Sequence, residues 1–484
     1  MRIRSLLVAS AAMGGAACSP LGGDAASVEQ AAEQAPPRAV RTLSAQNRKF
    51  VDRQGRVVIL RGVNVAGNSK VPPFVPYDDP KSFDALARLG MNVIRLPFIW
   101  EAFEPTRGQY DGNYLARMQG VARDAWARGL HVVVDFHQDG FSRFSIGGCG
   151  SGFPDWVSPV DVLHSTPSNT EAHCSDWAQR MFLDWDMHSS FGAFYRNDRG
   201  VRDAFLEMVK RVSAAFARVE GVAGYDMLNE PWGNDSELAP LYEDEARAIR
   251  SEDPGAILFV EAHITTNGGL PSTLARPSFA NMAYAPHYYD PITMLNKSYD
   301  GDPVGIDGAF ATMNAKAAEW NVPLFVGEFG MFAAFERVSA YVQREYENLD
   351  VLLANGTQWN YSPRWSRTNK DGWNGEDLNI IERETTAPRP NFRIRPYPRA
   401  TAGLPLSFAF KEKSGGGLVT GYQLDYRWRH NPGAGATEIS LPLALFGAST
   451  QVQATGATCV RQGEVLACTS DEAGEAVLRV LATP

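Results

Sequence analysis

The chain has 484 residues, which is too long for one ordinary hydrophobic core, so we expect two domains or a large barrel with an accessory domain. Its composition is that of a globular protein, with 44% hydrophobic and 21% charged residues. The formal net charge of −9 argues against nucleic acid as a partner, because phosphate binding needs a basic face. No run of about 20 apolar residues follows the N-terminal region, so we expect no membrane-spanning helix.

Residues 1–18 are typical of an export signal. Arg2 and Arg4 supply a basic start, Leu6–Met13 an apolar stretch, and small residues lead to Cys18. The segment resembles a bacterial lipoprotein signal, in which the cysteine becomes lipidated and N-terminal. Gly15 stands where that pattern usually has leucine, so cleavage and secretion is the alternative. We therefore expect an outer-membrane or periplasmic lipoprotein attached through Cys18, or a secreted protein.

The cysteines agree with export. Besides Cys18, the chain has Cys149 with Cys174 and Cys459 with Cys468, two local pairs suited to short disulfides in an oxidising compartment. The alternative is four buried thiols. None of the spacings is that of a zinc site, and we expect no metal.

Residues 19–46 are rich in Ala, Gln, Glu and Pro, and we interpret them as a flexible tether. A hairpin is predicted at 50–57, and strands then alternate with helices. Strands are predicted at 59–65, 92–97, 131–136, 224–228, 257–261, 283–287, 324–328 and 357–361, and helices at 82–89, 114–128, 201–219, 237–251, 308–320 and 336–348. Eight such units indicate an α/β fold, a (β/α)8 TIM barrel over residues 47–385. A doubly wound open sheet is the alternative, but no glycine-rich phosphate loop follows the first strand.

Two segments depart from this alternation. The connection 138–200 after the third strand is far longer than a usual loop and rich in aromatic residues, which indicates a functional insertion. Short alternating runs with Gly-rich turns over residues 386–484 predict a small C-terminal all-β sandwich. The insertion and the apolar stretch Val71–Pro76 are consistent with an apolar trough beside a sugar-binding site. They are equally consistent with aromatic side chains that pack a self-contained long loop.

Polar and aromatic residues gather at the predicted C-terminal strand ends, where barrel enzymes carry their active sites. They are Arg95 at strand 2, His137 and Asp139 at strand 3, Asn229 and Glu230 at strand 4, His287 and Tyr289 at strand 6, Glu328 at strand 7 and Trp359 at strand 8. Each residue alone has a structural explanation, but their convergence on one mouth predicts an active site.

Two facing carboxylates suit glycoside hydrolysis, in which one attacks the anomeric carbon and the other protonates the leaving oxygen. Glu230 would then need a pKa above the usual value of about 4.3 for a glutamate. Glu328 would have to be ionised, with help from Arg95 and Tyr289. Asn229 could hydrogen-bond the sugar 2-hydroxyl, and Trp359 could form an apolar floor for the ring.

Several motifs resemble glycoside hydrolase family 5, and within it the endoglycoceramidases. They are Arg61-Gly62-Val63-Asn64 with Lys70, Asp135-Phe136-His137-Gln138-Asp139, Leu228-Asn229-Glu230-Pro231-Trp232, Ala285-Pro286-His287-Tyr288-Tyr289-Asp290, Gly327-Glu328-Phe329-Gly330, Asp371-Gly372-Trp373-Asn374 and Arg395-Pro396-Tyr397-Pro398. The resemblance extends from about Asn47 to the C-terminus.

The resemblance implies Glu230 as acid/base and Glu328 as nucleophile of a retaining enzyme, with no metal or organic cofactor. It implies that Lys70, His137, Asp139, Asn229, His287, Tyr289 and Trp359 contact the sugar or position the glutamates, although Trp365 is an alternative to Trp359. The substrate would be a glycosphingolipid cleaved between glycan and ceramide.

Two other functions compete with glycosphingolipid cleavage. One is hydrolysis of a polysaccharide such as β-glucan, and the other is sugar binding by a non-catalytic surface lipoprotein. The expected partner is thus a glycolipid or an oligosaccharide, and we expect a monomer.

Overall fold

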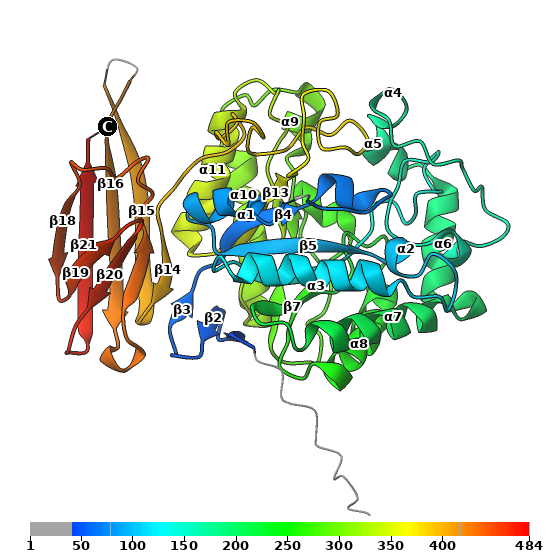
Figure 1. Cartoon of the computed structure of the whole chain (residues 1–484), viewed down its shortest axis with the longest axis horizontal. Coiled ribbons are helices and arrows are strands. Elements are labelled where there is room, and N and C mark those ends of the chain that lie inside the picture. Colours follow the sequence, from blue (N-terminus) through cyan, green and yellow to red (C-terminus); the bar gives the residue numbers. More distant parts are fainter. Residues whose placement is uncertain (1–40, 78, 416–417, 484) are drawn as a thin grey trace, which may run out of the picture. The chain divides into compact units, whose positions relative to one another are not determined.

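Eight parallel strands form the central sheet of the structure, a computed structural model that describes residues 41–77, 79–415 and 418–483 (Figure 1). Their order is β11-β13-β4-β5-β6-β7-β8-β9, and a parallel bridge between Tyr284 and Leu324 joins β9 to β11 and closes the barrel. The strands are β4 (Arg61–Val65), β5 (Val93–Ile99), β6 (His131–His137), β7 (Val222–Asp226), β8 (Ile257–Val260), β9 (Met282–Tyr284), β11 (Phe325–Val326) and β13 (Asn355–Tyr361). The predicted TIM barrel is confirmed.

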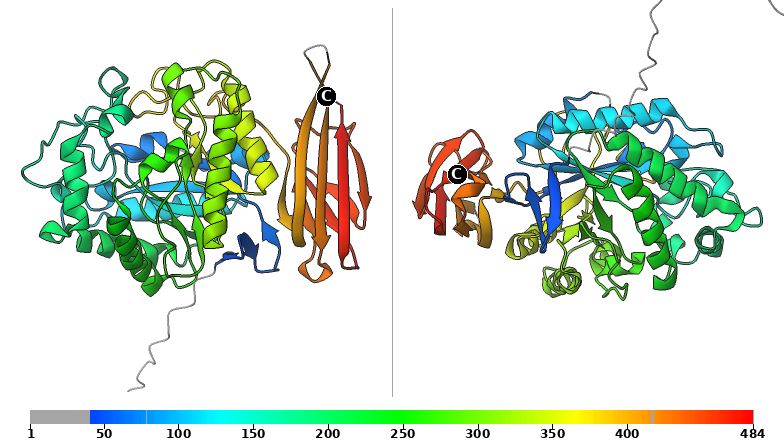
Figure 2. Two further views of the ribbon diagram at one scale, coloured as in Figure 1. Left: turned by 180° about the vertical axis from the view of Figure 1, so that it is seen from behind. Right: turned by 90° about the horizontal axis from the view of Figure 1, so that it is seen from below.

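Helices surround these strands, as both views of Figure 2 show. The longer ones are α1 (Ser82–Arg88), α3 (Gly112–Trp126), α7 (Val201–Phe216), α8 (Asp235–Glu252), α10 (Val304–Trp320) and α11 (Val338–Leu352). All six predicted helices are present, with ends shifted by a few residues. Local sequence fixes some starts: the Asn234 side chain caps α8, and Glu237 returns a hydrogen bond to the Asn234 backbone. No helix among the described residues is long and apolar enough to cross a membrane.

The sixth and seventh barrel strands are each interrupted near their C-terminal ends, where the sequence predicted continuous strands. Short strands β10 (His287–Tyr288) and β12 (Glu328–Phe329) follow β9 and β11 and pair with each other in parallel. Pro286 has no backbone N–H for the ladder, and a Cβ at Gly327 would lie 2.8 Å from the His287 ring. The break places His287 directly opposite Glu328 in the β10–β12 register.

The N-terminal strands lie beneath the barrel and belong to another sheet. Strands β1 (Leu43–Gln46), β2 (Lys49–Asp52) and β3 (Val57–Val58) form an antiparallel meander, and Phe50 packs against Phe259 and Phe325 at 5.9 and 6.4 Å between ring centroids. The prediction of a flexible tether through residue 46 is therefore wrong for its last residues, since β1 is paired strand packed against the barrel. The signal and the rest of the tether, residues 1–40, lie outside the described residues.

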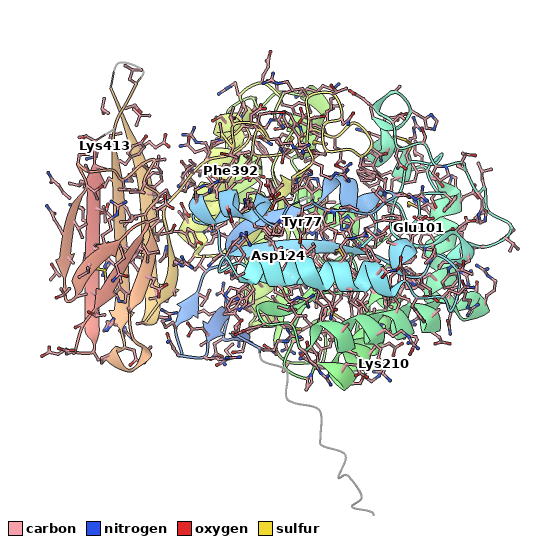
Figure 3. The ribbon with its side chains drawn as sticks, viewed as in Figure 1. Tyr77, Glu101, Asp124, Lys210, Phe392 and Lys413 are labelled. Carbon is pink, nitrogen blue, oxygen red and sulfur yellow. A yellow bond between two sulfur atoms is a disulfide. The ribbon has the colours of Figure 1, made fainter. Side chains whose placement is uncertain are left out.

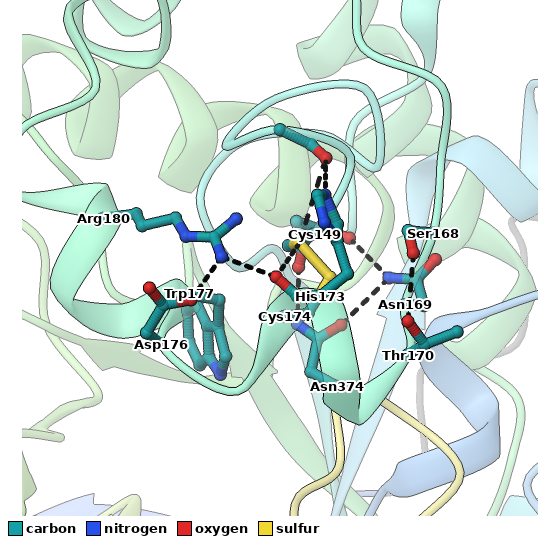
Figure 4. Close-up of a disulfide and its surroundings, with 12 residues drawn as sticks. Cys149, Ser168, Asn169, Thr170, His173, Cys174, Asp176, Trp177, Arg180 and Asn374 are labelled. Atoms are coloured by element: carbon teal, nitrogen blue, oxygen red, sulfur yellow. Dashed lines mark hydrogen bonds and ion pairs between the residues drawn. A yellow bond between two sulfur atoms is a disulfide. The ribbon is translucent and has the colours of Figure 1, made fainter.

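The insertion after β6 is folded around its own aromatic core. It contains η2 (Asp155–Val157), α4 (Glu171–Cys174), α5 (Trp177–Met181), α6 (Trp185–Tyr195) and η3 (Asp198–Gly200). Five of its aromatic side chains are buried in the cluster that also contains Trp100 and Phe205, namely Phe141, Phe153, Phe191, Phe194 and Tyr195. Phe182 and Trp185 instead are 46% and 80% exposed. The Cys149–Cys174 disulfide, shown in Figure 4, closes the insertion on itself.

The loop after β4 is tied to the barrel's outer helices. It contains η1 (Gly67–Lys70), and further along it Tyr77 Oη donates to the Asp124 carboxylate of α3 at 2.5 Å (Figure 3). Phe74 packs edge-on against Tyr114 in the core. The apolar stretch Val71–Pro76 thus contributes a core contact as well as exposed prolines.

The C-terminal residues form the predicted β-sandwich, with the second Cys pair also joined as a disulfide between β19 and β20. One sheet, in the order β15-β16-β21-β18, packs its apolar face on β17 and β20 through Leu424, Trp428, Ile439, Leu466 and Leu478. The strands are β14 (Tyr397–Thr401), β15 (Gly403–Gly415), β16 (Leu418–His430), β17 (Thr437–Ser440), β18 (Gln451–Thr455), β19 (Thr458–Gln462), β20 (Val465–Thr469) and β21 (Gly474–Ala482). The other sheet runs β1-β2-β3-β14-β17-β20-β19, so the N-terminal strands continue it.

The remaining short helices are α2 (Trp100–Phe103), α9 (Pro291–Asn296), η4 (Ile264–Gly268) and η5 (Pro432–Ala434). Of these, α2, α9 and η4 follow the C-terminal ends of barrel strands. They therefore border the mouth of the barrel, on which the predicted site residues converge.

Candidate active site

Glu230 lies just beyond the end of β7, and its carboxylate is held from one side. Oε1 accepts from Asn267 Nδ2 at 2.7 Å and lies 2.8 Å from His287 Nδ1. Burial raises the pKa of the Glu230 carboxyl, and the neighbouring Glu328 adds to this, whereas His287 opposes it. Because both neighbours engage Oε1, Oε2 is the oxygen left to carry a proton.

Glu328 begins β12 and faces the same space. Arg95 Nη1 donates to its Oε1 and Tyr289 Oη to its Oε2, both at 2.8 Å. Burial and the Glu328 charge raise the pKa of the Tyr289 phenol well above its usual value, so the hydroxyl keeps the proton that it donates. Both oxygens of Glu328 therefore accept from a donor, one of which is a cation.

The two glutamates are close neighbours. One carboxylate oxygen of each, together with a ring nitrogen of His287, lie within 4.8 Å of one another. His287 Nδ1 is 3.7 Å from Glu328 Oε2. The two carboxyl groups and the His287 ring thus border the same space.

Arg95 organises the barrel interior below the glutamates. Its guanidinium contacts four buried carboxylates, Asp135 at 3.1 Å, Asp226 at 2.8 Å, Glu261 at 3.2 Å and Glu328 at 2.8 Å. It also donates to the side-chain oxygens of Asn64 and Asn229. Burial alone would lower the pKa of Arg95, but these carboxylates hold it well above its usual value. One fully buried cation thus links strands β4 to β8 with β12.

A second chain of charges extends from Arg95 towards the loop after β4. His137 lies between Asp135, 2.7 Å from Nδ1, and Asp139, 3.0 Å from Nε2. Burial would lower the pKa of His137, but the two carboxylates raise it to about 9. Asp139 in turn pairs with Lys70 Nζ at 2.9 Å.

Two tryptophan rings enclose Lys70. Its Nζ lies 4.1 Å from the Trp359 ring centroid and 3.9 Å from that of Trp373. Trp359 also stacks on His137, with ring centroids 5.7 Å apart and planes 8° apart. Trp365 instead donates to Asp377 and packs against Arg389. Trp359 is therefore the strand-8 tryptophan at the site.

All ten predicted site residues belong to one connected network. The Asn229 side chain is fully engaged with protein, because Oδ1 accepts from Arg95 at 2.7 Å and Nδ2 donates to the Gln138 carbonyl at 2.9 Å. Its contact with a sugar hydroxyl stays a prediction.

The sequence prediction gave no role to several residues of this network, among them Glu261, Asn267, Trp373 and Glu376. Glu261 ends the fifth strand, and only the strand-end rule could have pointed to it. Trp373 lies within a quoted motif but was assigned no role. Glu376 accepts from Trp177 Nε1 of the insertion at 3.2 Å and from Trp359 Nε1 at 3.4 Å. No local pattern marks Asn267 or Glu376.

The side chains of the site that could bind a metal ion are already engaged with other groups of the protein. Three clusters of side chains bring ligand-type atoms within 4.8 Å of one another, namely Cys149/His173/Cys174, Asp226/Glu261/His287 and Glu230/His287/Glu328. In the first, both sulfurs form the disulfide. In the other two, Arg95, Asn267 and Tyr289 donate to the carboxylates and would compete with a metal ion. The arrangement suits proton transfer and charge stabilisation by side chains.

A cavity of about 310 Å³ lies beside the Glu230 loop. Trp232, two residues after Glu230, lines it and stacks on His188 of α6, with ring centroids 4.0 Å apart. The exposed rings of Phe182 and Trp185 continue this surface, 5.8 Å from Trp232 and 5.7 Å from His188. The insertion therefore presents apolar side chains around Trp232, which is two residues along the chain from the candidate acid.

Comparison with known proteins shows the enzyme family to which the chain belongs. The family model described as Cellulase (glycosyl hydrolase family 5) matches residues 51–371, and the glycoside hydrolase family 5 C-terminal domain matches residues 395–480. The chain belongs to glycoside hydrolase family 5. It is therefore a glycosidase that hydrolyses glycosidic bonds, and the non-catalytic sugar-binding alternative is set aside.

Within family 5 the chain is similar to endoglycoceramidases. Endoglycoceramidase I of Rhodococcus hoagii is 27% identical over 483 residues, covering 92% of this chain and 89% of the relative. Endo-glycoceramidase II from Rhodococcus sp., solved in complex with ganglioside GM3, is 25% identical, with a TM-score of 0.73 over 90% of this chain and 98% of that one. Sterylglucosidase 1 of Cryptococcus neoformans shares the fold at 17% identity, with a TM-score of 0.74 over 93% and 99% of the two chains.

Proposed function

We propose that this family 5 glycosidase cleaves the β-glycosidic bond between the glycan and the ceramide-like lipid of glycosphingolipids, with retention of configuration. The observation that carries the mechanism is the closeness of the two glutamates, whose oxygens lie within 4.8 Å. Retaining glycosidases hold their carboxyl groups about 5–5.5 Å apart, whereas inverting ones need roughly 6.5–9.5 Å to admit a water.

In the first step a Glu328 oxygen attacks the anomeric carbon as the bond to the leaving oxygen breaks, and Glu230 gives that oxygen its proton. The product is a glycosyl ester on Glu328 and a free lipid alcohol. In the second step Glu230, now a carboxylate, takes a proton from water, which attacks the anomeric carbon and releases Glu328. Arg95 and Tyr289 stabilise the charge of Glu328 before attack and after release.

The sugar side of the site is proposed to lie over Lys70, Trp359 and Trp373. These groups combine an ammonium donor with ring faces, a usual combination for binding hydroxyl-rich rings. Lys70 comes from the loop after β4, Trp359 from β13 itself and Trp373 from the loop after β13. Strands β4 and β13 are neighbours in the barrel, whereas the Glu230 loop follows β7. The glycan and the leaving group would therefore occupy opposite sides of the mouth.

The lipid side is proposed to begin at Glu230, because the acid must contact the leaving oxygen. The apolar surface of Trp232, Phe182 and Trp185 supports this placement, since neighbouring exposed apolar side chains that form a patch mark a binding surface. The similarity to endoglycoceramidases supports ceramide as the aglycone.

The test is product analysis on a panel of glycosphingolipids in detergent micelles, with a sterol glucoside and a soluble β-glucan as alternatives. We expect an intact oligosaccharide and free ceramide, identified by mass spectrometry. Glu328→Gln should abolish release under the same conditions. Hydrolysis of β-glucan with every lipid left intact would replace the proposal by the polysaccharide alternative.

We also propose that the chain is exported. Two disulfides, Cys149–Cys174 and Cys459–Cys468, are typical of oxidising compartments and support this. Lipidation of Cys18 is tested by the mass of the mature N-terminal peptide. A diacylated cysteine would establish membrane attachment, and an unmodified N-terminus would indicate secretion.

A further inference from the structure

Glu261, which follows β8 at the end of the fifth barrel strand, is 1% exposed and contacts three parts of the site. Its Oε2 accepts from the Glu230 backbone N at 2.9 Å. Its Oε1 accepts from Arg95 Nη2 at 3.2 Å and lies 3.3 Å from His287 Nε2. The contact between Glu261 Oε1 and His287 Nε2 is an ion pair, but the two groups are not aligned for a hydrogen bond. None of the roles given above requires this carboxylate.

The backbone contact fixes the acid's own residue. Glu230 has a φ of +42°, a left-handed conformation that residues other than glycine seldom adopt. The acceptor for its N–H is the Glu261 side chain, which is itself held by Arg95. Glu261 therefore helps to set the direction in which the Glu230 side chain leaves the backbone.

The second contact of Glu261 is with His287, whose ring lies between the carboxylates of Glu230 and Glu261. Nδ1 faces Glu230 Oε1 at 2.8 Å, and Nε2 faces Glu261. For Nδ1 to donate to Glu230 while Nε2 faces a carboxylate, the ring must be an imidazolium. Burial alone would lower the pKa of His287, but Glu261 and Glu328 hold it well above its usual value.

Other charged groups also surround this ring. Asp135 on β6 and Asp226 on β7 interact with it electrostatically, and Glu328 lies 3.7 Å from Nδ1. The Arg95 cation opposes their combined negative charge from below. Of these carboxylates, Glu261 lies closest to the Nε2 edge, 3.3 Å away.

We propose that Glu261 is a positioning residue for the acid/base, acting through His287 and the Glu230 backbone. It keeps His287 a donor at Nδ1, so that Glu230 Oε1 stays an acceptor and the catalytic proton resides on Oε2, towards the leaving oxygen. The proposal rests on the acid/base role of Glu230 given under the proposed function.

The test compares leaving groups. In Glu261→Gln, His287 loses a neighbouring negative charge, so its own pKa falls and Glu230 loses a positive neighbour. The pKa of Glu230 then rises, and it becomes a weaker acid. We expect kcat/KM to fall about tenfold or more for a glycoside with a lipid alcohol as leaving group. For a dinitrophenyl glycoside of the same sugar, which needs no protonation, the fall should stay under about threefold.

The pH profile supplies the second readout. For the lipid substrate, the alkaline limb of kcat/KM should move to higher pH in Glu261→Gln. Glu261→Asp keeps the charge but shortens the reach, so it should retain the wild-type limb while losing rate on the lipid alcohol. Glu245→Gln is the matched control, because Glu245 on α8 is a fully buried carboxyl without a hydrogen-bond partner among the described residues.

If kcat/KM of Glu261→Gln falls equally on both substrates and the alkaline limb of the pH profile does not move, the role of Glu261 is structural. If kcat/KM falls on neither substrate, Glu261 has no positioning role. Melting temperatures of all variants separate misfolding from catalysis, and Glu261→Asp keeps the test open if Glu261→Gln does not fold. Glu230→Gln must itself show the leaving-group dependence. If it does not, the proposed function fails, whereas dependence in Glu230→Gln without it in Glu261→Gln overturns the present inference alone.

Discussion

At the scale of single residues, Glu230 needs a proton to act as an acid, and burial beside Glu328 favours the protonated form. Activity that requires the protonated carboxyl is complete below its pKa and is lost as pH rises through it. On the lipid substrate, the pKa that governs the alkaline fall of kcat/KM should therefore lie above that of an ordinary glutamate, which is about 4.3. A pH profile with the dinitrophenyl substrate should lack this limb, and the same limb on both substrates would contradict its assignment to Glu230.

The hydrogen bond from Tyr289 to Glu328 can be tested by removing the Tyr289 hydroxyl. Its hydroxyl donates to Glu328 Oε2 at 2.8 Å, and a hydrogen bond to a charged group contributes about 1.5–3 kcal/mol. Tyr289→Phe should lower kcat by roughly tenfold to a hundredfold, with a smaller effect on KM. Tyr242→Phe removes another buried hydroxyl, one without a hydrogen-bond partner among the described residues, and should leave kcat unchanged. A loss confined to KM in Tyr289→Phe would argue against a role at Glu328.

Residue types at strand ends identified side chains that the structure brings together, because each was both chemically apt and next to a clear strand. Glu230 and Glu328 also sit in recognisable motifs. Asn267 and Glu376 could not be found this way, since they lie in irregular loops whose path depends on tertiary packing. Asn267 reaches Glu230 from 37 residues away in sequence.

At the scale of elements, strand order was predictable, but the interruptions of the sixth and seventh strands were not. The β10–β12 pairing depends on Pro286 and on the space that Gly327 leaves for the His287 ring. A Cβ at Gly327 would meet that ring at 2.8 Å. Each segment reads as one short apolar run up to His287 or Glu328, so the sequence pattern alone indicates one continuous strand.

The insertion is a folded element whose disulfide lies beside Asn374, a residue of the loop after β13 (Figure 4). The Cys149 carbonyl accepts from Asn374 Nδ2 at 2.6 Å. Asn374 adjoins Trp373, which packs on Lys70 and, with ring centroids 4.9 Å apart, on Trp177 of the insertion. The disulfide therefore helps to fix the loop that carries Trp373.

Replacing Cys149 and Cys174 together by serine should have two effects. A loop of this length loses about 3 kcal/mol of stability, measured by denaturant unfolding. The looser Trp373 loop should also raise KM severalfold. The matched control is the double serine variant of Cys459 and Cys468, a pair across adjacent strands of the sandwich, which should leave KM unchanged. Equal effects on KM from the two pairs would contradict the connection to the site.

At the scale of the whole molecule, the chain is less divisible than the predicted domain limits of 47–385 and 386–484 imply. Strand β3 pairs with β14, joining Val57–Val58 to Ala400–Thr401, and Arg395 bonds Asp350 of α11 at 2.7 Å. Pairing between segments more than 300 residues apart leaves no local signal, so the sequence could indicate the sandwich but not the shared sheet.

Removing residues 386–484 should therefore destabilise the barrel. The truncated chain loses the β3–β14 pairing and the buried Arg395–Asp350 ion pair, which leaves the buried Asp350 carboxylate with Arg61 as its remaining ion-pair partner. We expect a lower melting temperature or insolubility. Arg427→Ala, which removes an exposed ion pair with Glu475 within the sandwich, should melt near the wild type. A truncated barrel with wild-type melting and activity would contradict this account.

The central claim is that Glu230 and Glu328 are close enough for double displacement. The most direct measurement is proton NMR of the sugar first released from a β-linked glycolipid, before mutarotation. The account predicts that the β anomer appears first. Initial release of the α anomer would show a single displacement by water and would contradict the roles given to both glutamates.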